Sequence, residues 1–311
     1  MLPLPPFSWE APDRLDDLLA LAAAPGARLV AGGTDLLPSM KHRLFTPSAL
    51  VSLGRLPELA RVEPTEGGGL RLGATVTLAA LAAHPLVRAR YPALAEAAST
   101  VATPTIQGMG TLGGNLMLDT RCVYYNQPQG WRDGLGGCLK ASGTVCHVAR
   151  TGTGCYAAHS ADTVPVLWLY GATVELASSA GVRSVMVRDL FGDDGRDWLR
   201  VRPGEVLTAV ELPPPGSPVA YRKLRRRDAI DYGLLLVAAT AEEQGGRAVL
   251  SALGPRPVEV VADRLDDLPE AAWAAARPLP THLTPAPWRK HMARVEVRRA
   301  IEALQRSSRS I

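Results

Sequence analysis

The sequence predicts an α+β protein made of two small α/β units followed by a C-terminal α+β domain. Three observations lead to this class: a strand, a glycine turn and a helix follow one another over residues 28–41, a proline-rich run occupies 213–218, and all four cysteines fall within 121–156. At 311 residues the chain is long enough for two or three domains, each with its own core. The expected units are 1–57, 58–215 with an insertion at 118–158, and 216–311.

Composition limits the classes of function. Hydrophobic residues make up 47% and charged residues 21% of the chain, as in ordinary globular proteins. The net charge of +4 is too small and too scattered to predict nucleic-acid binding. The N-terminus lacks the basic flank and apolar run of a signal peptide, and no apolar stretch approaches the roughly 18 residues of a membrane span. We therefore expect a cytoplasmic protein without membrane contact, in which the thiols stay reduced and two disulfides are the weaker interpretation.

The first unit contains the first sign of a ligand site. A helix is expected over 13–24, where leucines fall on one face before Pro25-Gly26 ends it. The strand at 28–31 runs directly into Gly32-Gly33, and a helix is expected at 36–41, with a second strand at 48–53. A strand, glycine turn and helix in this order direct free backbone N–H groups at a bound phosphate.

The other two units follow from periodicity and breakers. Strands are expected at 61–64, 69–74, 172–178, 182–190, 204–213, 221–227, 234–242 and 248–254. Helices are expected at 77–84, 86–101, 162–170, 268–276 and 287–306. Residues 108–113 spell GxGxxG, but no strand precedes them, so a Rossmann fingerprint is disfavoured. The glycine turns at 31–35 and 111–115 are each weak signals that together could grip one pyrophosphate.

The cysteine stretch, residues 121–156, is rich in glycine and has no apolar periodicity. It therefore cannot fold around a core of its own, and something other than packing must hold it. Fifteen, seven and eight residues separate its successive cysteines. This spacing is neither that of a ferredoxin nor the paired spacing of most structural zinc sites. The spacing alone leaves iron–sulfur and zinc open, with His147 and His159 as possible zinc ligands.

Three segments carry a family resemblance. Residues 29–41, 111–115 and 159–176 resemble the flavin-contacting segments of the FAD subunits of molybdenum hydroxylases, the xanthine dehydrogenase and carbon monoxide dehydrogenase group, and 206–213 and 221–227 also match. The cysteine insertion is similar to that of the β subunits of 4-hydroxybenzoyl-CoA reductases, which carry a [4Fe–4S] cluster there. The resemblance implies a fold in which two α/β units enclose FAD, with a C-terminal α+β domain and an inserted iron–sulfur loop.

The resemblance also implies a set of site residues. Residues 29–36 would wrap the pyrophosphate, residues 111–115 would cover its other side, and Asp162 would accept a hydrogen bond from a cofactor hydroxyl. The implied FAD contacts are Leu29, Val30, Ala31, Gly32, Gly33, Thr34, Asp35, Leu36, Val101, Thr111, Leu112, Gly113, Gly114, Asn115, Asp162, Leu207 and Lys223. The implied cluster ligands are Cys122, Cys138, Cys146 and Cys155. Simpler interpretations are a helix N-cap for Asp162 and a solvated strand charge for Lys223.

The implied function is electron transfer inside a larger enzyme. One cluster would use every cysteine, which leaves no ligands for the family's [2Fe–2S] centres, and no segment resembles a molybdopterin domain. The implied partners are a molybdopterin-containing large subunit, a small [2Fe–2S] subunit and a ferredoxin-like electron donor, and the implied reaction is reductive dehydroxylation of 4-hydroxybenzoyl-CoA. No catalytic acid, base or nucleophile is predicted in this chain. Two alternatives are a flavoprotein whose loop is held by structural zinc, and a scaffold that binds no flavin.

Overall fold

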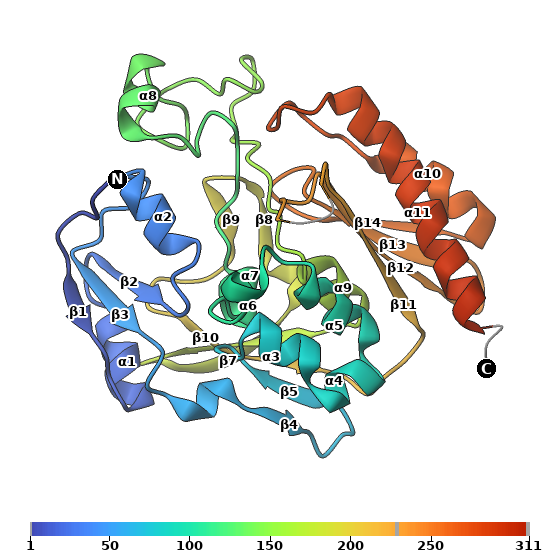
Figure 1. Ribbon diagram of the computed structural model, residues 1–311, viewed down its shortest axis with the longest axis horizontal. Coiled ribbons are helices and arrows are strands. Elements are labelled where there is room, and N and C mark those ends of the chain that lie inside the picture. Colours follow the sequence, from blue (N-terminus) through green and yellow to red (C-terminus); the bar gives the residue numbers. More distant parts are fainter. Residues whose placement is uncertain (1, 228–229, 309–311) are drawn as a thin grey trace.

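The N-terminal unit of the computed structural model, which describes residues 2–227 and 230–308, is a small three-stranded sheet with two helices (Figure 1). Its elements are β1 (Ser8–Glu10), α1 (Leu15–Ala22), β2 (Ala27–Val30), α2 (Leu36–Lys41) and β3 (Ala49–Ser52). The strands are parallel in the order β1-β3-β2. The glycine turn follows the end of β2 and leads into α2. Helix α1 buries Leu18 and Leu19 against Val51 and Val206, which ties this unit to the next sheet.

A five-stranded antiparallel sheet forms the middle of the molecule, in the order β4-β5-β10-β6-β7. Its strands are β4 (Val62–Pro64), β5 (Leu70–Gly73), β6 (Thr173–Ser178), β7 (Gly181–Met186) and β10 (Val206–Leu212). Associated helices are α3 (Leu78–Ala83), α4 (Pro85–Arg90), α5 (Pro92–Ser99), α6 (Pro104–Gln107), α7 (Leu112–Leu116) and α9 (Val164–Leu169). A hairpin of β8 (Phe191–Asp194) and β9 (Asp197–Leu199), which the sequence did not predict, rises beside them (Figure 1).

The prediction of a single helix over 86–101 is wrong. Proline 92 follows Tyr91, whose backbone leaves the helical region (φ −137°, ψ 57°), and the chain forms α4 and α5 instead. The ring of a proline disfavours the helical conformation of the residue before it, and Pro92 then suits the first turn of the new helix.

The C-terminal unit is a four-stranded antiparallel sheet covered on one face by two helices (Figure 1). Its elements are β11 (Val219–Leu224), β12 (Leu235–Ala241), β13 (Gly246–Ser251), β14 (Val258–Ala262), α10 (Leu268–Ala275) and α11 (Ala286–Ser308). The opposite face, with Leu236, Ala238 and Val249, joins the core of the middle unit. Strand β11 ends at Leu224, so the predicted strand over 221–227 was too long and Arg225–Arg227 lie beyond its end.

The cysteine insertion has a small core of its own, contrary to the prediction. It contains one short helix, α8 (Gln129–Gly134), and packs Tyr125 and Ala157 against Cys122, Cys138 and Cys155. The periodicity could not reveal this core because the cysteines themselves form it. No helix within residues 2–227 or 230–308 is long and apolar enough to cross a bilayer.

Buried Arg132 of α8 attaches the insertion to the N-terminal unit. Its guanidinium donates to the backbone carbonyls of His42 and Arg43, at 3.0 Å each, and to that of Gln127. The insertion is therefore anchored to the end of α2, the helix that follows the first glycine turn.

Candidate functional site

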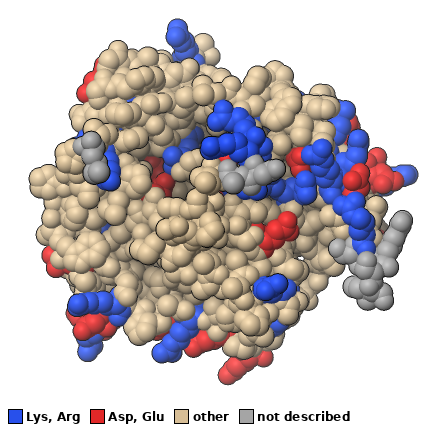
Figure 2. Space-filling view, in the orientation of Figure 1, with Lys and Arg blue, Asp and Glu red and all other residues tan. Residues whose placement is uncertain are grey.

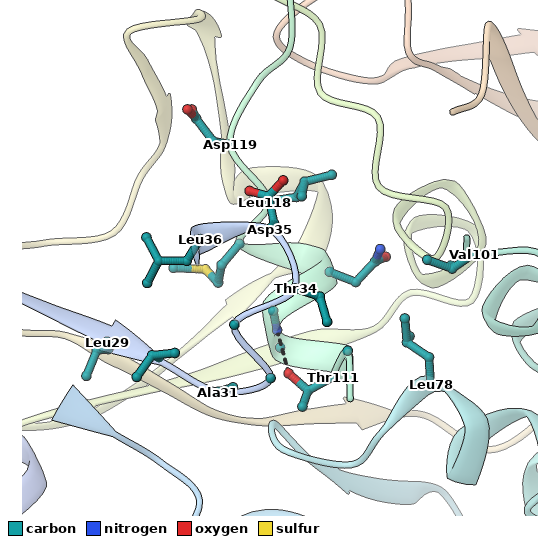
Figure 3. A pocket seen from close by; sticks show the side chains of 18 of the residues that line it. Leu29, Ala31, Thr34, Asp35, Leu36, Leu78, Val101, Thr111, Leu118 and Asp119 are labelled. Carbon is teal, nitrogen blue, oxygen red and sulfur yellow. Dashed lines mark hydrogen bonds between the residues drawn. The ribbon is translucent and has the colours of Figure 1, made fainter. Parts of the chain in front are cut away.

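A cavity of about 620 Å³ lies where the three sheets meet (Figure 3). Its walls come from the β2–α2 turn, from α7 and the segment before it, from the β8–β9 hairpin, and from the chain after β11. A volume of this size suits a large cofactor held between units.

The first glycine turn packs against residues 109–110, directly before the second glycine turn, at the wall of this cavity. A Cβ atom on Gly32 would lie 1.8 Å from the carbonyl oxygen of Met109, so only glycine allows this approach of one backbone to the other. Gly33 adopts φ +68°, which also favours glycine. On the other side, Thr111 begins α7, and its hydroxyl accepts a hydrogen bond from the N–H of Gly114 at 3.1 Å.

The predicted FAD contacts converge on the cavity, with one exception. Those that line it are Leu29, Val30, Ala31, Gly32, Gly33, Thr34, Asp35, Leu36, Val101, Thr111, Gly113, Gly114, Asn115, Asp162, Leu207 and Lys223. Leu112 does not: it is fully buried in the main hydrophobic core. The segments thus meet as the resemblance implied, while the contact made by each residue stays a prediction.

A buried ion pair lines the cavity. The Nζ atom of Lys223 lies 2.7 Å from Oδ1 of Asp162 and also donates to the carbonyl of Thr100 at 2.9 Å. The hydroxyl of Tyr221 donates to the same Asp162 oxygen at 3.0 Å. Burial raises the pKa of Asp162, and the Lys223 ammonium opposes that rise. The solvated-strand interpretation of Lys223 was therefore wrong, and the N-cap of α9 is Thr163 rather than Asp162.

Sequence reasoning missed several residues of the cavity wall. Asp119, Ser160, Trp198 and Tyr232 line it, and Trp198 belongs to the hairpin that was not predicted. Asp119 stands three residues before Cys122, and nothing in its neighbourhood distinguished it from an ordinary loop carboxylate.

The four cysteines line a second, small cavity, which we call the cysteine chamber. Its other walls include Tyr124, Tyr125, Lys140 and His147. The four thiols are free and lie in residues that are only 6–9% exposed. The chamber thus gathers into one place all the cysteines of a 34-residue span of sequence, from 122 to 155.

Of the two histidines that were possible zinc ligands, only one lines the chamber. His147 lines the chamber, and its Nε2 atom lies 2.6 Å from the carbonyl oxygen of Gly137. His159 does not line it; its ring packs on Phe191 with centroids 4.8 Å apart. Its burial lowers the pKa of His159 to about 4, so it is neutral at physiological pH.

Burial affects the ionisation of two of the chamber thiols. Burial raises the pKa of Cys122 to about 11 and also raises that of Cys155, so these two thiols bind a metal only with loss of their protons. Backbone N–H groups of Tyr124 and Tyr125 donate to the Cys122 sulfur, and that of Ala157 donates to Cys155. Hydrogen bonds of this kind stabilise sulfur ligands of iron–sulfur centres.

The chamber is small, with a volume of about 20 Å³. A tetrahedral zinc with bonds of about 2.3 Å holds its sulfurs roughly 3.8 Å apart. Within the described part of the chain, no three His, Cys, Asp or Glu side chains are gathered closely enough to hold one metal ion. The chamber offers the four buried cysteine sulfurs and His147 as possible donors.

Comparison with known proteins agrees with the large cavity as a site for FAD. The family model described as "FAD binding domain in molybdopterin dehydrogenase" matches residues 5–215. The aldehyde oxidoreductase FAD-binding subunit PaoB of Escherichia coli (strain K12) is 36% identical over 255 residues, which cover 78% of this chain and 80% of that protein. The carbon monoxide dehydrogenase medium chain of Afipia carboxidovorans is 29% identical over 317 residues, which cover 95% and 96%. In the crystal structure of quinoline 2-oxidoreductase from Pseudomonas putida 86, a chain superposes with a TM-score of 0.75 at 27% identity over 97% of this chain and 98% of that one.

The fold and the large cavity define an FAD-binding α+β protein. More particularly, the chain belongs to the family of FAD-binding subunits of molybdenum hydroxylases, and it is a subunit of an oxidoreductase complex. We refer to the cavity of about 620 Å³ from here on as the flavin cavity.

Proposed function

We propose that this chain is the electron-transfer subunit of a molybdenum enzyme and carries a [4Fe–4S] cluster in addition to FAD. The residues proposed to contact FAD are those that line the flavin cavity, and the proposed cluster ligands are Cys122, Cys138, Cys146 and Cys155. When bound, the cluster supplies one-electron chemistry and the flavin both one- and two-electron chemistry, while the protein positions and tunes them.

The observation that carries the proposal is the cysteine chamber. Its four buried, free thiols fit the four cysteine ligands of a [4Fe–4S] centre. The preference for a cluster over zinc rests on the resemblance of the cysteine insertion to that of 4-hydroxybenzoyl-CoA reductase β subunits. A loop held by zinc and a scaffold without flavin are the two alternatives.

The surface near the chamber supports an acidic electron donor such as a ferredoxin-like protein. A groove beside the chamber is lined by Arg121, Arg226 and Cys122. Basic side chains gather on the same face of the molecule near the end of β11 (Figure 2), and Arg226 and Arg227 have side chains 54% and 68% exposed. A positive surface that reaches a cluster ligand suits the docking of a negatively charged carrier.

The remaining partners in the proposal are a molybdopterin-containing large subunit and a small [2Fe–2S] subunit. Within the proposal the reaction is reductive dehydroxylation of 4-hydroxybenzoyl-CoA, implied by the cysteine insertion. A second candidate is aldehyde oxidation, because the relative at 36% identity is named as a subunit of an aldehyde oxidoreductase. Assay of the assembled complex with both substrates separates them: dehydroxylation driven by reduced ferredoxin supports the first and aldehyde-dependent dye reduction the second.

A Cys138→Ser variant tests the role of the chamber. Purified without oxygen, the variant is expected to lose iron and acid-labile sulfide while it keeps FAD, because Cys138 lines the chamber and not the flavin cavity. Reduced ferredoxin should then reduce its flavin far more slowly than in the wild type, while dithionite reduces both. An unchanged iron content and unchanged flavin reduction would contradict the proposal.

A further inference from the structure

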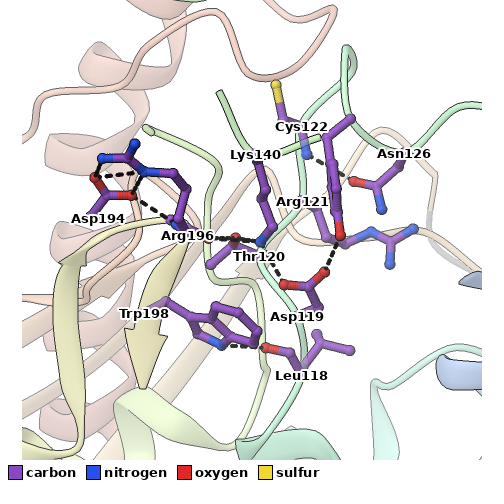
Figure 4. Close-up of polar contacts among 12 residues, drawn as sticks. Leu118, Asp119, Thr120, Arg121, Cys122, Asn126, Lys140, Asp194, Arg196 and Trp198 are labelled. Atoms are coloured by element: carbon purple, nitrogen blue, oxygen red, sulfur yellow. Dashed lines mark hydrogen bonds and ion pairs between the residues drawn. The ribbon is translucent and has the colours of Figure 1, made fainter. Parts of the chain in front are cut away.

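One buried ion pair joins the two cavities (Figure 4). Asp119 lines the flavin cavity, Lys140 lines the cysteine chamber, and the Nζ atom of Lys140 lies 2.5 Å from Oδ1 of Asp119. Their side chains are only 7% and 6% exposed, respectively. The other carboxylate oxygen, Oδ2, accepts a hydrogen bond at 2.9 Å from the hydroxyl of Tyr125, which also lines the chamber.

The Lys140 ammonium is fixed from every side. It donates to Asp119, to the hydroxyl of Thr120 and, at 2.7 Å, to the carbonyl of Gly195 at the tip of the β8–β9 hairpin. It also lies 4.4 Å from the ring centre of Trp198 and 4.7 Å from that of Tyr125, at cation–π distance. Trp198 in turn lines the flavin cavity. A charge held in this way keeps its position relative to both cavities.

The hairpin tip brings the same pair close to the sulfurs. A Cβ atom on Gly195 would lie 2.9 Å from Sγ of Cys155, and the N–H of Gly195 donates to the carbonyl of Cys155 at 2.7 Å. The ammonium is therefore on the chamber side of the wall and the carboxylate on the flavin side.

Reduction of either centre adds negative charge, which determines the sign of the effect. A buried cation stabilises the reduced form and raises the reduction potential, and a buried anion lowers it, because the low dielectric of the interior screens neither. Removal of Lys140 leaves Asp119 uncompensated, so both potentials should fall. Removal of the Asp119 charge leaves Lys140 uncompensated, so both should rise.

We propose that the Asp119–Lys140 ion pair is a positioning element that couples the flavin cavity to the cysteine chamber and sets the reduction potentials of both centres. This inference rests on the proposed function, since it concerns the two centres named there. It assigns no proton transfer and no bond change to either residue.

Anaerobic redox titration tests the inference, with the flavin followed by absorbance and the cluster by electron paramagnetic resonance. Lys140→Met should lower each equilibrium constant for one-electron reduction at least tenfold, which is about 59 mV, and Asp119→Asn should raise each by a similar factor. The double variant should return to within about threefold of the wild type. Shifts in the same direction in both single variants, or no shift in either, would overturn the inference.

Controls separate the possible causes of failure. Arg71 and Glu175 form an ion pair at 2.7 Å, and neither residue lines either cavity. Arg71→Met breaks this pair and should leave both reduction potentials unchanged. Asp119→Asn is a nearly isosteric change. If Lys140→Met does not fold, the expected rise of both reduction potentials in Asp119→Asn tests the inference by itself. Wild-type protein with FAD but no iron would overturn the proposed function together with this inference. If the protein contains both FAD and the cluster but neither reduction potential changes in the variants, the inference alone is overturned.

Discussion

Replacement of Gly32 by alanine tests whether the close approach of the first glycine turn to the segment before the second one forms the FAD site. The new Cβ atom would lie 1.8 Å from the carbonyl oxygen and 2.5 Å from the carbonyl carbon of Met109. Non-bonded carbon atoms pack at about 3.5–4.0 Å, so the two segments must separate by well over 1 Å. Both contacts are backbone atoms, which cannot rotate away as a side chain does.

The structure gives a magnitude for this change. Overpacking of this kind costs about 1–3 kcal/mol, and the strain is relieved if the two segments move apart and loosen their grip on the cofactor. At about 1.4 kcal/mol per tenfold change in affinity, FAD should bind roughly 5- to 150-fold more weakly. Titration of the deflavinated protein with FAD, followed by quenching of flavin fluorescence, measures the dissociation constant.

Gly108→Ala is the matched control. Gly108 does not line the flavin cavity, its φ is −67°, and its new Cβ atom would lie 3.6 Å from its nearest neighbours, the carbonyl oxygens of Pro104 and Thr105. Its FAD affinity should equal that of the wild type. Wild-type affinity in Gly32→Ala, with an unchanged midpoint of unfolding, would refute the reasoning.

Three further predictions concern stability, each measured by urea unfolding of the flavin-free chain. Lys223→Met leaves the Asp162 carboxylate buried without its cation and should lower the free energy of unfolding by about 3–5 kcal/mol; a loss below 1 kcal/mol would contradict the buried ion pair. Thr77→Ala removes the hydroxyl that accepts from the N–H of Ala80 at the start of α3, and should cost about 1 kcal/mol, whereas no loss would argue against this cap. The pKa of His159 is about 4 in the fold and about 6.5 when unfolded, so the unfolded chain binds the extra proton as pH falls between these values. The stability that neutral His159 contributes is complete above pH 6.5 and falls by about 2 kcal/mol between pH 7.5 and pH 5. A His159→Phe variant should lose that part of the pH dependence. An identical pH dependence in the variant and the wild type would contradict the lowered pKa of His159.

Local signals in the sequence predicted much of the fold. The helix over 36–41 begins and ends as predicted, because a glycine turn precedes it, and the cap at Thr77 is confirmed by its hydrogen bond. The strands of the middle sheet were recognisable from alternating apolar residues. The break at Pro92 was a local signal that the prediction overlooked.

Other features depend on contacts between distant residues and could not be predicted from local sequence. The β8–β9 hairpin is short and irregular, with a register shift, and lacks a clear period. Asp119 and Lys140 are 21 residues apart in an aperiodic region, and only the folded insertion brings them together. In the sequence, Lys223 is one of several basic residues of a strand. Its partner Asp162 is 61 residues earlier, so only the fold brings the two together.

Metal and sulfide analysis of the wild-type protein, prepared without oxygen, tests the central claim most directly. About four irons and four acid-labile sulfides per FAD, with no zinc, are predicted from the four thiols of the chamber. One zinc per FAD, or neither metal in a chain whose four cysteines remain free, would contradict the account and leave a flavoprotein without the second redox centre.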